Sequence, residues 1–198
     1  MAGQETTSTT ITMGMIFLLL NPEVQKKLHE ELDTVVGSDR FITLEDKPNL
    51  HYTNAVIQEI LRIGISIGMA PFRRTTKDVQ IKGYFIPKHT TIGPQASIVL
   101  HDEKLFPDPN RFMPERFLDS NGNFKNSDQV ITFGIGKRVC PGESLARMEV
   151  YLFIANLLNM FKYSVIPEKP PTLERQMGAG NPPFPFVCKI EDRFGKSK

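Results

Sequence analysis

The stretch Phe133–Gly142, FGIGKRVCPG, carries the most information about this chain. Its three glycines fall within nine positions directly before a predicted helix, which indicates a backbone bent tightly enough for a flat or bulky group to approach. Cys140 lies at the start of that helix, where unpaired N–H groups and the helix dipole favour an anion such as a thiolate. Arg138 adds a permanent cation two residues earlier. The stretch therefore predicts a thiolate that binds a ligand carrying carboxylates.

The other residues narrow the choice of ligand. Zinc would need three or four His or Cys ligands, and none of the histidines has ligand spacing to Cys140. Covalent c-type haem would need the motif C-x-x-C-H, which is absent. One thiolate beside Arg138 fits haem bound non-covalently, whose iron takes a single proximal cysteine and whose propionates need cations. The second cysteine, Cys188, is interpreted as a small buried hydrophobe.

The composition is that of a folded chain large enough for one domain. The 198 residues are 40% hydrophobic and 23% charged, which excludes wholesale disorder. The net charge of +2 gives no reason to expect nucleic acid as a partner. The apolar run Ile11–Leu20 is well short of the ~20 residues that a bilayer span needs, so no transmembrane anchor is predicted in this chain.

Hydrophobic periodicity and turn residues predict mainly helical structure with small antiparallel β-sheets. Helices are expected at about residues 6–20, 22–36, 50–62 and 142–161. A short hairpin is expected at 79–86, an ordered meander at 106–133 whose phenylalanines need burial, and an irregular tail around 182–184. Thirteen of the fifteen prolines lie at or beyond Pro71, which argues against a plain helical bundle.

The cysteine stretch resembles the haem-binding loop of the cytochrome P-450 family, the haem-thiolate monooxygenases. The pattern F-x-x-G-x-R-x-C-x-G is matched at Phe133, Gly136, Arg138, Cys140 and Gly142. Five fixed positions in ten residues make this a specific match.

Three further motifs of that family precede the cysteine stretch, in the order in which the family has them. Ala2–Thr7 resembles the oxygen-activation motif, Glu59–Arg62 the E-x-x-R helix and Phe112–Phe117 the meander motif. The hairpin and the Pro182–Phe184 tail are most similar to microsomal, animal-type members. The resemblance covers essentially the whole chain.

This resemblance implies that residues 1–198 form a single partial domain, the C-terminal part of the cytochrome P-450 fold with its N-terminal half absent. That part would comprise the oxygen-activation helix, the E-x-x-R helix, the hairpin, the meander, the cysteine loop, the final long helix and a β/loop tail. Full-length members lie at the endoplasmic reticulum membrane on its cytosolic face. A buried structural triad of Glu59, Arg62 and Arg116 is also implied.

The resemblance also implies a set of site residues. Haem b would be bound non-covalently, with Cys140 as the metal ligand and Arg138 as the partner of a propionate. The remaining cofactor-binding residues would be Phe133, Gly134, Gly136 and Gly142. Glu5 and Thr6 would act catalytically, as an acid and a hydroxyl that relay protons.

The implied reaction inserts one atom of dioxygen into a small lipophilic substrate and reduces the other to water. The thiolate ligand donates electron density to iron and so favours cleavage of dioxygen. Substrate contacts would lie at Ala2, at 65–70 and at 178–181. Electrons would come from an external donor such as a flavoprotein reductase, for which basic side chains form a candidate docking patch unless they are simply solvated. Those side chains are Lys125, Lys137 and Arg147.

Two departures from the family pattern bear on these expectations. Phe72 follows Pro71 where many relatives have a histidine that contacts a propionate, so Arg138 would carry more of that contact, or Arg73 or Arg74 would substitute. The oxygen-activation helix also begins at its own motif, which places Glu5 and Thr6 in a first turn prone to fraying. A non-catalytic haem-binding remnant is therefore the alternative. A thiol-redox protein is disfavoured because neither cysteine belongs to a C-x-x-C pair.

Overall fold

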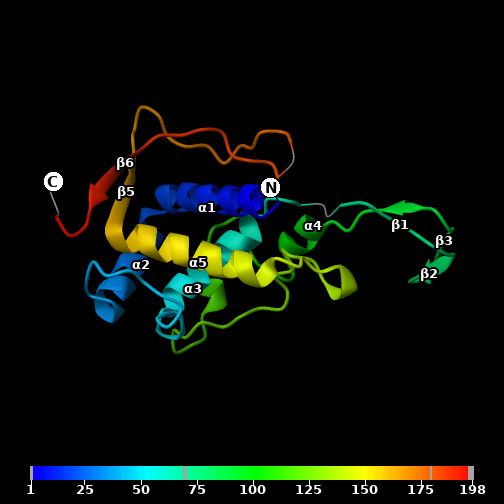
Figure 1. The fold of residues 1–198 in the computed structure, drawn as a ribbon, viewed down its shortest axis with the longest axis horizontal. Helices are drawn as coiled ribbons and strands as arrows, with labels where there is room; N and C mark the ends of the chain where they lie inside the picture. Colours follow the sequence, from blue (N-terminus) through cyan, green and yellow to red (C-terminus); the bar gives the residue numbers. More distant parts are fainter. Residues whose placement is uncertain (1, 69–70, 179, 196–198) are drawn as a thin grey trace.

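A computed structural model of the chain describes residues 2–68, 71–178 and 180–195. The long helices pack against one another, a long irregular segment runs beside them, and a thin arm formed by β1 to β4 projects from one end (Figure 1). The helices are α1 (Ala2–Leu20), α2 (Pro22–Val35), α3 (His51–Ile63), α4 (Ala96–Leu100) and α5 (Glu143–Met160), with 3₁₀ turns η1 (Lys47–Asn49), η2 (Pro114–Phe117) and η3 (Gly136–Arg138). No helix among the described residues is long and apolar enough to cross a membrane.

Three antiparallel strand pairs accompany the helices. The strands are β1 (Arg73–Arg74), β2 (Val79–Ile81), β3 (Tyr84–Ile86), β4 (Thr91–Ile92), β5 (Phe161–Val165) and β6 (Cys188–Asp192). They pair as β1 with β4, β2 with β3 and β5 with β6. The predicted hairpin is confirmed, because Lys82 and Gly83 have φ of 48° and 85° and so form the left-handed turn that joins two such strands. The mainly helical class with small antiparallel sheets is confirmed as well.

The core lies where α1 meets α3 and α5. Met13, Ile16 and Leu18 of α1 are almost completely buried, because the second half of that helix is apolar on every side. Gly14 permits the close approach, since a Cβ at that position would lie 2.9 Å from Cδ1 of Ile60 on α3. The four predicted long helices are confirmed, with α1 beginning four residues earlier than expected.

The meander is ordered, as predicted, and its aromatic side chains are buried. Phe106 and Phe117 pack together in a small second core that also includes Val130. Phe112 instead stacks on Phe17 of α1, with ring centroids 5.1 Å apart. The irregular segment is therefore held both by its own aromatic residues and by the main helical core.

Candidate functional site

The cysteine loop is a closed turn ahead of α5. The backbone N–H of Cys140 donates to the carbonyl of Phe133 at 2.9 Å, which closes the two ends of the loop on each other. Gly134 and Gly136 have φ of 81° and 72°, a conformation that side chains with a Cβ rarely adopt. No atom lies within 4 Å of a Cβ built at either glycine, so the glycines face open space. The expected tight bend is therefore present.

The loop presents its functional groups outward. Cys140 is an exposed free thiol, and Arg138, two residues earlier, is also exposed. Ile135 and Val139 are 73% and 41% exposed, so the loop also presents apolar surface to solvent. A thiol, a guanidinium and an apolar surface are thus available together to a ligand, whereas no group of three or more His, Cys, Asp and Glu side chains in the described ranges could share a metal ion.

Gly142 and Glu143 connect the loop to α5. Gly142 is the N-cap residue of that helix, and its carbonyl accepts from the N–H of Ala146 at 2.9 Å. The N–H of Glu143 donates to the carbonyl of Cys140 at 3.3 Å. A Cβ on Gly142 would lie 4.0 Å from Sγ of Cys140, an ordinary contact. The cysteine backbone is therefore joined directly to the first turn of a long helix, whose buried residues lie further along, from Val150 to Asn159.

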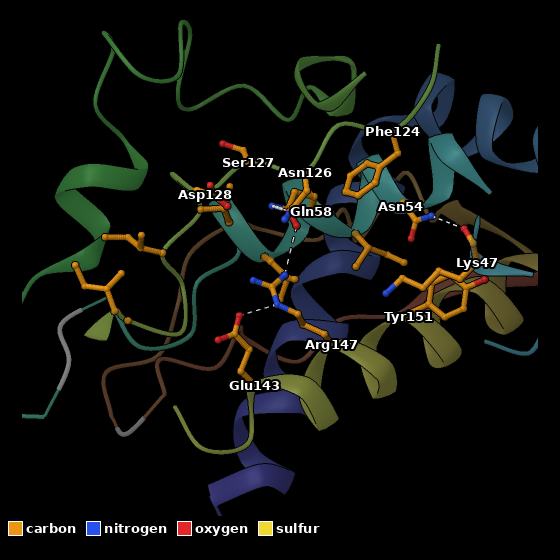
Figure 2. A pocket seen from close by; sticks show the side chains of 16 residues that line it. Lys47, Asn54, Gln58, Phe124, Asn126, Ser127, Asp128, Glu143, Arg147 and Tyr151 are labelled. Atoms are coloured by element: carbon orange, nitrogen blue, oxygen red, sulfur yellow. Dashed lines mark hydrogen bonds and ion pairs between the residues drawn. The ribbon is translucent and has the colours of Figure 1, made fainter. Parts of the chain in front are cut away.

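Arg147 has a different role from the one expected for it. Its Nε forms an ion pair with Glu143 at 2.8 Å and its Nη1 donates to Oε1 of Gln58 at 3.4 Å (Figure 2). Its guanidinium carbon lies 4.9 Å from the ring centroid of Phe133, a cation–π contact. The guanidinium of Arg147 thus contacts three side chains of this chain behind the cysteine loop. The i,i+4 spacing of Glu143 and Arg147 is a sequence signal that could have identified this pair.

A cavity of about 470 Å³ lies between α3, α5, the meander and the cysteine loop, and the sequence did not indicate it. Figure 2 shows polar side chains of both helices around it, with Asn126, Ser127 and Asp128 of the meander opposite. Burial and, next, the charge of Arg147 lower the pKa of Lys47, whose ammonium lies 5.3 Å from the ring centroid of Tyr151. Gly134 and Ile135 also line the cavity, so its polar side chains lie directly behind the cysteine loop.

The predicted triad is confirmed by its geometry. Glu59 and Arg62 lie one turn apart on α3 and are completely buried, with Nε of Arg62 2.7 Å from Oε2 of Glu59. Arg116 in η2 donates its Nε to Oε1 of Glu59 at 3.1 Å. One carboxylate therefore bridges two guanidinium groups from separate segments.

The two arginines of the triad also hold the irregular backbone. Arg62 donates to the carbonyls of Leu100 and Pro109 at 2.6 Å and 2.8 Å. Arg116 donates to the carbonyl of Pro107 at 3.0 Å. Because buried carbonyls need donors, the two bonds of Arg62 satisfy groups that would otherwise have no partner. The triad thus anchors the meander that leads into the cysteine loop.

Glu5 and Thr6 lie at the same end of the packed helices as the cysteine loop, since α1 and α5 both begin there (Figure 1). Glu5 is exposed, and the hydroxyl of Thr6 donates to the carbonyl of Ala2 at 2.8 Å. Within the described residues, no hydrogen bond joins either side chain to the loop. The hydroxyl–carboxylate contact between α1 and α5 is instead that of Thr7 with Glu149 at 3.1 Å.

The expected substrate positions are only partly described. Ile65 and Ser66 are buried, and the carbonyl of Ile65 accepts from Nη1 of Arg175 at 2.6 Å. Burial lowers the pKa of Arg175. Ile67 is 41% exposed and Ala2 is exposed. Met69, Ala70 and Ala179 were expected to contribute but lie outside the described residues.

Phe72 and the two arginines that could replace the missing histidine lie at the start of the arm formed by β1 to β4. Phe72 is 63% exposed. Arg73 lies in β1 opposite Ile92, and Nε of Arg74 donates to the carbonyl of His89 at 3.2 Å. Arg74 is therefore already used in a contact within the arm.

A family model described as Cytochrome P450 matches residues 1–190. The chain is 46% identical over 160 residues to cytochrome P450 2A3 of Rattus norvegicus, covering 81% of this chain and 32% of that protein. It is 44% identical over 192 residues to cytochrome P450 2C70 of Mus musculus, covering 96% of this chain and 39% of that protein. It is 47% identical over 160 residues to cytochrome P450 2C8 of Homo sapiens, covering 81% of this chain and 33% of that protein.

The chain thus spans about a third to two fifths of the length of these curated relatives. The match nevertheless runs through the helix of the triad, the meander and the closed cysteine loop, which are the parts that the structure joins into one body. This chain belongs to the cytochrome P450 family.

Proposed function

We propose that this chain provides the thiolate side of a haem monooxygenase, with Cys140 as the axial ligand of the iron of haem b. One observation carries the proposal: Cys140 is an exposed free thiol in a loop closed on Phe133 and bordered by two glycines that face open space. In this proposal residues 1–198 form one partial domain corresponding to the C-terminal part of the cytochrome P450 fold. The continuous core shared by α1, α2, α3 and α5 supports that assignment.

The residues of the loop fit haem chemically. Haem needs one soft donor for iron, an apolar surface for the ring and cations for its propionates. Cys140 supplies the first, Ile135 and Val139 the second and Arg138 the third. When bound through a thiolate, haem activates dioxygen so that one oxygen atom enters a lipophilic substrate and the other leaves as water.

The chain itself would orient the ligand and move protons. The bond from Cys140 N–H to the carbonyl of Phe133 fixes the thiol at the mouth of the loop. Arg138 would orient a propionate, and Gly134, Gly136 and Gly142 would leave room for the ring. At α1, the carboxylate of Glu5 would hold a proton that the hydroxyl of Thr6 passes on, once that hydroxyl releases the carbonyl of Ala2.

The proposal also assigns partners and location. Dioxygen, a small lipophilic substrate and an external electron donor such as a flavoprotein reductase are its partners, with the endoplasmic reticulum membrane, cytosolic face, as its location. Lys125 and Lys137 are exposed and support a basic docking surface near the loop. Arg147 is not part of that surface in our proposal, because its charge is paired with Glu143.

A second candidate is a chain that binds haem without turning over. The exposure of Glu5 favours it, because directed proton delivery works best in a site that excludes water. The two candidates share the same ligand and differ only in their distal chemistry.

The test is haem reconstitution of the 198-residue chain, followed by reduction and carbon monoxide. We expect the far-red Soret band of thiolate-ligated haem, its loss in Cys140→Ser and its retention in the matched control Cys188→Ser. A chain that takes up no haem, or whose band persists in Cys140→Ser, would refute the ligand assignment. Substrate oxidation with NADPH and an added reductase then separates the enzyme from the non-catalytic candidate.

A further inference from the structure

Gln58 is a buried polar residue of α3 to which the proposed function gives no role. It is only 4% exposed and lies beside Glu59 of the triad. Its side chain lines the polar cavity behind the cysteine loop (Figure 2). A buried amide costs free energy unless both its oxygen and its nitrogen have partners. The partners of Gln58 therefore indicate what the residue does.

The two ends of the Gln58 amide bind different segments of the chain. Its Oε1 accepts from Nη1 of Arg147 on α5 at 3.4 Å. Its Nε2 donates to Oδ1 of Asn126 in the meander at 3.1 Å. Because a guanidinium can only donate, the first bond also fixes which end of the amide faces Arg147. One side chain of α3 thus joins both α5 and the meander.

Arg147 connects Gln58 to both backbone groups of Cys140. Its guanidinium carbon lies 4.9 Å from the ring centroid of Phe133, whose carbonyl accepts from the N–H of Cys140 at 2.9 Å. Its Nε pairs with Glu143 at 2.8 Å, and the N–H of Glu143 donates to the carbonyl of Cys140 at 3.3 Å. The guanidinium is planar and rigid, so partners on two of its edges fix the plane that meets the ring.

The cysteine loop needs this support because it has little packing of its own. Its thiol is exposed, and the space around Gly134 and Gly136 is open. The entry of the loop is held separately, since the hydroxyl of Thr132 donates to the carbonyl of Leu61 on α3 at 2.7 Å. Loss of Gln58 should therefore loosen the closed loop without detaching it from α3.

We propose that Gln58 is a positioning residue for the thiolate of Cys140. It holds the plane of Arg147 against the ring of Phe133 and so keeps the cysteine loop closed. The consequence for an iron ligand rests on the proposed function, whereas closure of the loop can be measured without haem.

Amide hydrogen exchange of the haem-free chain tests the proposal. In Gln58→Leu the N–H of Cys140 should exchange about tenfold faster, because Arg147 loses one of the bonds that orient it. The matched control is Gln25→Leu. Gln25 is also 4% exposed, and its amide donates to the carbonyl of Tyr163 at 3.0 Å and accepts from the N–H of Tyr163 at 2.8 Å. This control removes a comparable buried amide but should leave exchange at Cys140 unchanged.

Two further variants separate the orientation of Arg147 from the loss of a buried amide. Gln58→Glu keeps an acceptor for Arg147, and the amide of Asn126 can turn to donate to it, so protection of the Cys140 N–H should be retained. Arg147→Lys keeps the positive charge but not the plane, and should loosen the loop about as much as Gln58→Leu.

The spectrum of the reduced, haem-loaded chain with carbon monoxide gives a second readout. Gln58→Leu should convert part of the far-red Soret band into the band of haem that has lost its thiolate, whereas Gln25→Leu and Gln58→Glu should resemble the wild type. Wild-type exchange at Cys140 in Gln58→Leu, or an equal increase in Gln25→Leu, would overturn the positioning role. Absence of the far-red band from the wild-type chain would refute the haem assignment alone, because the exchange measurement needs no haem.

Discussion

The carboxylate of Glu59 accepts hydrogen bonds from both Nε and Nη2 of Arg62, at 2.7 Å and 2.8 Å, and neither side chain is accessible to solvent. Two parallel hydrogen bonds of this kind give an ion pair a fixed orientation as well as energy. Because Arg116 shares the same carboxylate, the pair determines where the meander lies relative to α3.

Glu59→Gln should destabilise the chain strongly. The substitution leaves Arg62 and Arg116 buried with uncompensated charge, which typically costs about 3–5 kcal/mol. Urea unfolding followed by circular dichroism measures the change. The control Glu30→Gln removes a carboxylate from the exposed pair with Lys26 and should change stability by less than ~1 kcal/mol. Similar losses in the two variants would contradict the structural role of the triad.

Glu31→Gln should weaken the N-terminus of α3. The carboxylate accepts from the backbone N–H groups of Tyr52 and Thr53 at 2.6 Å and 2.8 Å, so it caps a helix that has no side-chain cap of its own. We expect a loss of about 1–2 kcal/mol and faster amide exchange in the first turn of α3. Unchanged exchange there would show that the cap is dispensable. Glu30→Gln again serves as the exposed control.

Gly64→Ala should destabilise the end of α3. A Cβ there would lie 2.5 Å from the carbonyl oxygen of Ile60, which is too short for a real contact with backbone. The backbone must shift, at an expected cost of about 1–3 kcal/mol. Gly3→Ala, which meets nothing within 4 Å, should be neutral or slightly stabilising. Equal midpoints of urea unfolding for the two variants would argue against the strain.

Stability should fall as the pH drops from about 6.5 toward 4, because of His29. Burial, followed by the charge of Arg193, lowers the pKa of His29 to about 4, and its Nε2 has no hydrogen-bond partner among the described residues. In the unfolded chain the same imidazole is protonated near pH 6.5. The unfolded state therefore binds more protons in this window, which lowers the free energy of unfolding as pH falls.

Urea unfolding at pH 7 and pH 5 measures the effect of His29. His29→Gln should reduce the loss of stability between the two pH values. The control His89→Asn, at an exposed residue with φ of 69° that asparagine tolerates, should retain it. A wild-type loss that His29→Gln leaves intact would assign the pH dependence to other groups.

Arg138→Gln should weaken haem retention without changing the iron ligand. In the proposed site its guanidinium meets a propionate, and loss of a charge-assisted bond of about 1.5–3 kcal/mol corresponds to roughly ten- to a hundredfold weaker binding. Transfer of haem to apomyoglobin measures retention. Lys137→Gln removes an adjacent exposed charge and should have little effect. Equal transfer rates in the two variants would contradict the propionate contact.

The sequence alone determined the local elements and the cysteine loop. The repeating apolar positions of α2 and α3 arise from the helix period, and the Lys82-Gly83 turn requires left-handed backbone that glycine adopts easily. The motif around Cys140 likewise lies within ten consecutive residues. These features depend on neighbours along the chain, so they can be predicted without knowing the fold.

The tertiary structure alone decided which distant groups meet. Glu31 of α2 caps α3. The guanidinium of Arg147 contacts Phe133 and Gln58. Thr7, rather than Thr6, makes the hydrogen bond from α1 to α5. Spacing in the sequence does not encode these contacts, because each depends on how two separately formed helices pack and rotate against each other. The cysteine motif could thus be found from the sequence, whereas its support and the exposure of its thiol follow only from packing around the shared core.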